Sequence, residues 1–138
     1  MWWIFALLSA FFAALTAIFA KVGIKGVDTD LATAIRTVVI LILAWGIAFF
    51  RGGAANINTL TKQNIIFLVF SGIATGLSWI FYFKALQIGK VSQVAPIDKL
   101  SVAIAIILSV IFLNEQISTL GIIGVLLIIS GTILLIYS

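Results

Sequence analysis

Five long apolar stretches dominate the sequence and set the strongest limit on what the chain can fold into. A helix that crosses the hydrocarbon core of a bilayer needs roughly 20 mostly apolar residues. Each stretch is close to that length, and short connections separate the stretches. The sequence therefore predicts an all-α polytopic membrane protein with five transmembrane helices, at about residues 2–20, 31–50, 64–83, 91–113 and 119–137.

Composition supports this class and excludes several others. Hydrophobic residues make up 64% of the chain and charged residues 9%, whereas a soluble domain is about 25% charged. Because the five spans take up nearly the whole sequence, we expect one transmembrane domain over residues 1–138. The sequence has no cysteine and no histidine, which excludes disulfides, thiol catalysis and the usual zinc sites. With no nucleophile–base pair in view, we expect neither an enzyme nor a cofactor or metal.

The net charge of +4 is typical of membrane flanks and does not indicate a nucleic-acid surface. On the side of the membrane that holds the N-terminus, the loops carry Arg51 and Lys62. The opposite side carries Lys21, Lys25, Lys90 and, close to a span end, Lys84. Since cytoplasmic loops are enriched in basic residues, so small a difference specifies orientation poorly. We expect a multi-pass protein of the cytoplasmic membrane and leave insertion in both orientations open.

Charged side chains inside the predicted spans are the first candidates for function. A charge at the bilayer centre costs about 2.5–3.5 kcal/mol on insertion scales, so it usually has a partner or a task. Arg36 lies five residues into the second span, and Asp98 and Lys99 lie seven and eight residues into the fourth. We predict that these three residues belong to a substrate or proton pathway, and for Arg36 a purely structural ion pair is an equal alternative. Asp98 is the one embedded acid that could couple transport to protons.

Pro96 leaves two interpretations of the fourth span. If the helix begins at Pro96, Asp98 lies in its first turn, favoured by the helix dipole, and Lys99 extends toward the interface. If the helix begins earlier, Pro96 interrupts it and frees the carbonyl of Ser92, so that Asp98 faces a water-filled cavity. We favour the interrupted helix and include Pro96 in the predicted pathway.

Neighbouring residues point about 100° apart around a helix, so we expect Asp98 and Lys99 to find separate partners. Arg36 is the natural partner for Asp98, because a buried carboxylate without a cation takes up a proton. In the third span, Trp79 and Tyr82 carry polar tips on aromatic rings. They either line the pathway or pack against lipid and neighbouring helices.

Small residues predict where helices approach closely. Gly72 and Gly76 form a GxxxG pattern in the third span, which permits close contact between helices. In the last span, Gly121, Gly124 and Gly131 are candidates for a second such face. We predict that these five glycines serve dimerisation or helix packing.

Two motif-rich stretches in the second half of the sequence together resemble a known family. "WIFYFKALQIGKVSQVAPIDKLS", followed by "IFLNEQISTLGIIGVLLIISG", resembles the EamA-type repeat of the drug/metabolite transporter superfamily. The shared features are an aromatic-rich helix ending in Ala85-Leu86, a Val-Ala-Pro segment, and Glu115 before a Gly-rich last helix. The resemblance covers essentially all 138 residues, and its "APIDKLS" form is similar to the short five-helix branch of bacteria and archaea.

The resemblance implies half of a ten-helix transporter fold. Two such repeats, inverted relative to each other, make up most family members, so a chain with one repeat is expected to form a homodimer, with an antiparallel pair as one arrangement. The implied function is secondary transport of small metabolites or organic solutes by alternating access, with proton coupling or exchange as the driving force. The alternative is a membrane scaffold or accessory subunit that does not transport and needs a different partner chain.

Overall fold

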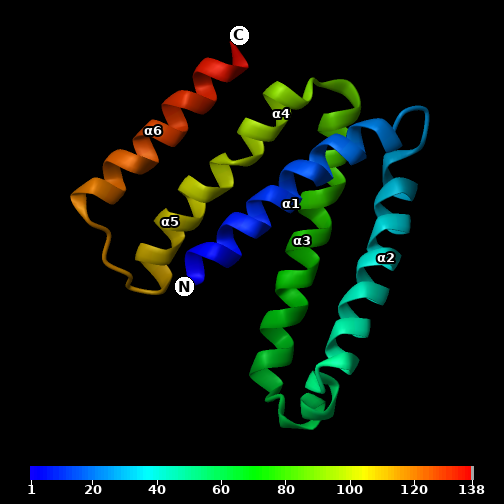
Figure 1. Cartoon of the computed structure of the whole chain (residues 1–138). Coiled ribbons are helices and arrows are strands. Elements are labelled where there is room, and N and C mark those ends of the chain that lie inside the picture. The colour runs from blue at the N-terminus through cyan, green and yellow to red at the C-terminus, as the bar shows by residue number, and fades with distance from the viewer. Residues whose placement is uncertain (138) are drawn as a thin grey trace. The chain divides into compact units, whose positions relative to one another are not determined.

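A computed structural model of the protein describes residues 1–137, and within that range every regular element is a helix. Figure 1 shows the helices in chain order. Their bounds are α1 (Trp2–Gly23), α2 (Thr29–Phe50), the 3-10 helix η1 (Gly53–Thr59), α3 (Lys62–Ile88), α4 (Val91–Asp98), α5 (Leu100–Phe112) and α6 (Thr119–Ile136).

The predicted all-α membrane architecture is confirmed. In the described residues, five helical segments are long and apolar enough to cross a membrane, with α4 and α5 together forming the fourth. The boundaries differ at some helix ends. α2 begins at Thr29 because Asp28 caps it, its Oδ1 accepting hydrogen bonds from the N–H groups of Asp30 and Leu31 at 3.0 Å each. α3 continues to Ile88, past the predicted end at residue 83.

The helices form two compact units, each of which has its own internal contacts. The α2–α3 unit comprises Phe19–Gln87, and the α4–α6 unit comprises Met1–Ile18 with the residues from Ile88 onward. α1 contributes its first part to the α4–α6 unit and its end to the α2–α3 unit.

The α2–α3 unit is a helical hairpin that turns through η1 (Figure 1). At its open end, the Gln87 side-chain amide donates to the carbonyl oxygen of Val27 at 2.9 Å. Lys21 Nζ donates to the carbonyl oxygen of Leu86 on α3. The first bond ties the loop after α1 to α3, and the second ties the end of α1 to a carbonyl in the last turn of α3.

In the α4–α6 unit, α6 runs back alongside α4 and α5, and it contacts both (Figure 1). Gln93 on α4 donates to the carbonyl of Ile136 on α6 at 3.4 Å. Val94 and Ala103 are among the few buried residues of this unit. The small size of its core means that most of the apolar surface of α5 and α6 remains available to lipid or to another chain.

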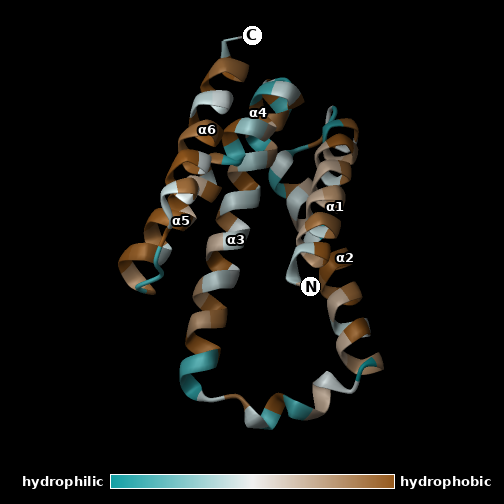
Figure 2. Cartoon of the chain, turned by 60° about the vertical axis from the view of Figure 1, so that its left-hand side comes forward, coloured by the Kyte–Doolittle hydropathy of each residue, from teal (hydrophilic) through white to brown (hydrophobic). Residues whose placement is uncertain are grey.

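The surface has the polarity expected of a membrane protein. Figure 2 shows hydrophilic residues gathered in the turn that holds η1, at the start of α3 and along α4, with hydrophobic residues over the rest of the long helices. Large apolar side chains are exposed along whole spans, for example Phe50 at 94% and Leu120 at 80%. In water such a surface would aggregate, whereas in a bilayer it is the surface that meets lipid.

The Asp28 cap can be tested by substitution. We expect Asp28→Ala to lower the free energy of unfolding by about 1 kcal/mol, because two N–H groups at the start of α2 lose their acceptor. The matched control is Asp30→Ala, which removes a carboxylate from the same turn but no cap. Thermal unfolding of the purified protein in detergent is the measurement, and an equal loss in both variants would contradict the capping role.

Candidate functional site

The fourth span is interrupted in the middle of its apolar length. α4 ends at Asp98 and α5 begins at Leu100, so only Lys99 separates the two helices. Pro96 lies inside α4 and has no N–H, and the carbonyl of Ser92 therefore loses its intrahelical donor. The helix begins at Val91. The alternative in which Pro96 starts the helix is wrong, and the span is interrupted at Lys99, after the helix has passed Pro96. A water-filled cavity at Asp98 stays a prediction.

Backbone hydrogen bonding continues up to Lys99 at the break. The Lys99 N–H lies 3.0 Å from the carbonyl oxygen of Pro96 and 3.3 Å from that of Ala95. The same Pro96 oxygen lies 3.4 Å from the hydroxyl of Thr132 on α6, which also donates to the Ile128 carbonyl at 2.8 Å. Thr132 is only 5% exposed. Sequence reasoning missed Thr132, and α6 contributes this hydroxyl at the break because the two helices pack together.

Asp98 and Lys99 form an ion pair with each other, with Asp98 Oδ2 and Lys99 Nζ 3.2 Å apart. The expectation of separate partners is wrong, because the long, flexible side chain of Lys99 reaches the carboxylate of its neighbour Asp98. A pairing of Arg36 with Asp98 stays a prediction.

In the α2–α3 unit, Arg36 lies over aromatic rings of α3. Its guanidinium carbon is 4.1 Å from the centroid of the Phe83 ring and 5.9 Å from that of Trp79. Tyr82 meets Phe83 edge to face, with ring centroids 5.6 Å apart. The predicted site residues Arg36, Trp79 and Tyr82 thus belong to one cluster. Phe83 was missed as a site residue, although its position four residues after Trp79 on one helix face could have indicated it.

The predicted site residues therefore form two groups. Arg36, Trp79 and Tyr82 lie in the α2–α3 unit, and the other three predicted residues, Pro96, Asp98 and Lys99, lie in the α4–α6 unit. One group presents a cation on aromatic rings, and the other presents an interrupted helix with an adjacent ion pair. The role of either group in a pathway stays a prediction.

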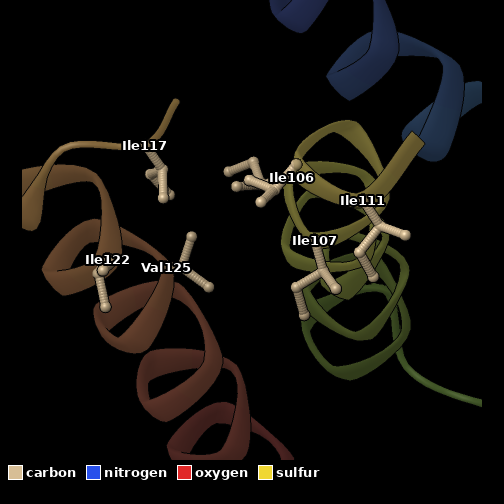
Figure 3. Close-up of a pocket in the computed structure, with 7 residues that line it drawn as sticks. Ile106, Ile107, Ile111, Ile117, Ile122 and Val125 are labelled. Atoms are coloured by element: carbon tan, nitrogen blue, oxygen red, sulfur yellow. The ribbon is translucent and has the colours of Figure 1, made fainter. Parts of the chain in front are cut away.

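A separate pocket of about 240 Å³ lies between α5 and α6 in the α4–α6 unit. Figure 3 shows side chains of α5 on one side and, facing them, side chains of α6 and of the preceding loop. All of the lining residues are aliphatic: Ile106, Ile107, Val110, Ile111, Ile117, Ile122 and Val125. Because none of these side chains can hydrogen-bond, the pocket suits a hydrocarbon chain and not a polar solute.

The predicted packing glycines are mostly open. A Cβ atom added at Gly72, Gly76, Gly124 or Gly131 would meet nothing within 4 Å, whereas one at Gly121 would lie 2.7 Å from Ile117 Cγ1 of the same chain. Four of the five positions therefore make no close approach to a helix within the described chain. Their faces are free to meet another chain, and dimerisation through them stays a prediction.

Comparison with known proteins points to one family. The sequence model of the EamA-like transporter family matches residues 1–137. An uncharacterized transporter in the cobO 3′ region of a Sinorhizobium species is 46% identical over 134 residues, which are 97% of this chain and 95% of that protein. An uncharacterized protein of Methanocaldococcus jannaschii is 35% identical over 77 residues, 55% of this chain and 56% of that protein. No solved structure matches the chain significantly.

Thiol labelling tests whether water reaches the break. Ser101 and Leu108 are both exposed, and seven residues place them on nearly the same face of α5. In the span Val91–Phe112, Ser101 lies near the middle and Leu108 lies closer to an end. We expect a charged, water-soluble thiol reagent to modify Ser101→Cys in liposomes and to leave Leu108→Cys unmodified, because the reactive thiolate forms only in water. Equal protection of both thiols would show that the break is dry.

Proposed function

The chain belongs to the EamA-like transporter family, and from this premise we propose that it is a secondary transporter of small metabolites or organic solutes that works as a homodimer by alternating access. As a multi-pass membrane protein, it would act in the cytoplasmic membrane. Transport would be driven by proton coupling or by exchange of solutes.

The interrupted fourth span is the observation that carries the proposal. A bilayer tolerates non-helical backbone only where protein or a water-filled cavity covers it. Transporters place such breaks at their solute and ion sites, because half-helix ends offer partial charges inside the membrane. Here Asp98 lies about 10 Å along the span at 1.5 Å per residue, directly beside the break. A purely structural span would have little reason to keep two charges at that depth.

Asp98 is the proposed coupling group. Within the single chain, its side chain is 32% exposed and that of its ion-pair partner Lys99 is 56% exposed, so the chain itself does not enclose the pair. A proton that neutralises Asp98 would release Lys99 and change the charge beside the break.

Open packing faces on this repeat support the proposed homodimer. Apart from a small core, the large side chains of the spans are exposed, and the faces of Gly72 and Gly76 on α3 have no neighbour within 4 Å. Small residues at such positions allow two helices to approach closely in a membrane. The weak charge difference between the two sides of the membrane supports an antiparallel pair, because it allows both orientations to insert.

Flux measurements with an Asp98 variant test this proposal. We expect the purified protein in proteoliposomes to take up solutes from a panel of labelled amino acids and organic acids when a pH gradient is imposed. We expect Asp98→Asn to reduce that uptake at least tenfold without impaired folding, because the amide keeps the shape of the carboxyl group but cannot exchange a proton.

Glu115→Gln is the matched control, since Glu115 is an exposed acid in the loop before α6 and should be dispensable. The folding of each variant is checked by its elution as a single species in detergent. Undiminished proton-driven flux in Asp98→Asn would exclude Asp98 as the coupling group. An absence of uptake by the parent protein across the whole panel would count against autonomous transport.

A further inference from the structure

Arg36 is held in the membrane by aromatic rings and not by an acid. Its guanidinium carbon lies 4.1 Å from the Phe83 ring centroid, well within the range of a cation–π interaction. Phe83 is 1% exposed, so its ring is a fixed wall beneath the cation. Trp79 lies on the same side of α3, with its ring centroid 5.9 Å from the same carbon.

The α2–α3 unit supplies no anion to balance this cation. Its acidic residues are Asp28 and Asp30, and in the part of the chain that the structure describes neither forms an ion pair with Arg36. The Asp28 carboxylate caps α2 instead. Asp30 precedes Arg36 by six residues, about 9 Å along the helix axis.

Stacking on a ring uses the face of a guanidinium and not its hydrogen-bonding edge. A guanidinium carries five N–H donors in its plane and has no acceptor, and a ring beneath it covers only its face. Two parallel N–H groups match the two oxygens of a carboxylate, which makes the bidentate pair strong and directional. The adjacent aromatic rings would meet the apolar body of the same molecule.

We propose that Arg36 binds the carboxylate of an organic acid, with Phe83 and Trp79 contacting its apolar part. The favoured ligand is a net anion without an ammonium group, because this unit offers no carboxylate near Arg36 to receive one. The inference rests on the proposed transport function for its biological meaning, and it defines the substrate class of that function. As a binding claim it can be tested without measuring transport.

Equilibrium binding to the purified protein in detergent provides this test. The probes are phenylacetate, its neutral amide phenylacetamide, the zwitterion phenylalanine and inorganic phosphate. We expect saturable binding of radiolabelled phenylacetate and competition by excess unlabelled phenylacetate, with at least tenfold weaker competition by each of the other three. The amide is the sharpest comparison, since it has nearly the same shape but no charge.

Variants of the cluster assign the binding to Arg36. We expect Arg36→Gln to weaken phenylacetate binding at least tenfold, and Arg36→Lys to weaken it about threefold or more because the charge remains but the fork is lost. Phe83→Leu keeps an apolar wall and should weaken binding about two- to tenfold through loss of the ring. Arg51→Gln, which removes an exposed arginine at the end of α2, is the matched control and should bind normally.

Two results would overturn the inference. One is phenylacetate binding in Arg36→Gln that equals binding in the parent protein while both elute as single folded species. The other is failure of the parent to prefer phenylacetate over the amide or the zwitterion, which includes failure to bind it at all. Uptake of neutral or cationic solutes by a protein that ignores phenylacetate would refute the inference and leave the transport proposal intact. Binding of phenylacetate without flux of any solute would refute the transport proposal and leave the binding inference intact.

Discussion

The hydrocarbon layer requires every backbone N–H and C=O group within it to have a partner, and the rest of this structure depends on that requirement. Four spans meet it as continuous helices, whereas the fourth span in chain order does not. Pro96 removes one donor, and Lys99 separates two half-helices. At the break, the Pro96 carbonyl oxygen lies within hydrogen-bond distance of the Lys99 N–H and of the Thr132 hydroxyl. A break that is retained in this environment is costly, and a transport site is the function that best accounts for it.

The Asp98–Lys99 pair and Arg36 are charged side chains within the spans, and they are stabilised in different ways. Asp98 and Lys99 form an ion pair with each other beside the break. Arg36 has its face on the buried Phe83 ring and has no acid of its own unit as a partner in the described structure. In a transporter, the first arrangement suits a proton or ion that comes and goes, and the second suits an anionic solute. The proposed division of tasks between the units follows from this difference.

Hydropathy alone was sufficient to predict the five spans, because length in a bilayer is a strong constraint. The break was predictable from Pro96, since the missing N–H is a property of one residue. The Asp98–Lys99 pair was not, because the angle between neighbouring residues on a helix leaves out the reach of the long lysine side chain. The end of α3 at Ile88 was missed because an apolar run stops where charge begins, while hydrogen bonding decides where a helix ends. That Phe83 would lie beneath Arg36 requires the packing of α2 on α3, which no local pattern contains.

We propose that one five-helix repeat forms a whole transporter by pairing with an inverted copy of itself. Its most direct test uses the absence of cysteine from the sequence. Asn56 lies exposed in η1, in the turn between α2 and α3, and Asn56→Cys can be labelled with an impermeant thiol reagent on sealed, oriented membranes before and after permeabilisation. If the dimer is antiparallel, we expect about half of the chains to be labelled from outside. Labelling of all chains or of none before permeabilisation would contradict the antiparallel dimer.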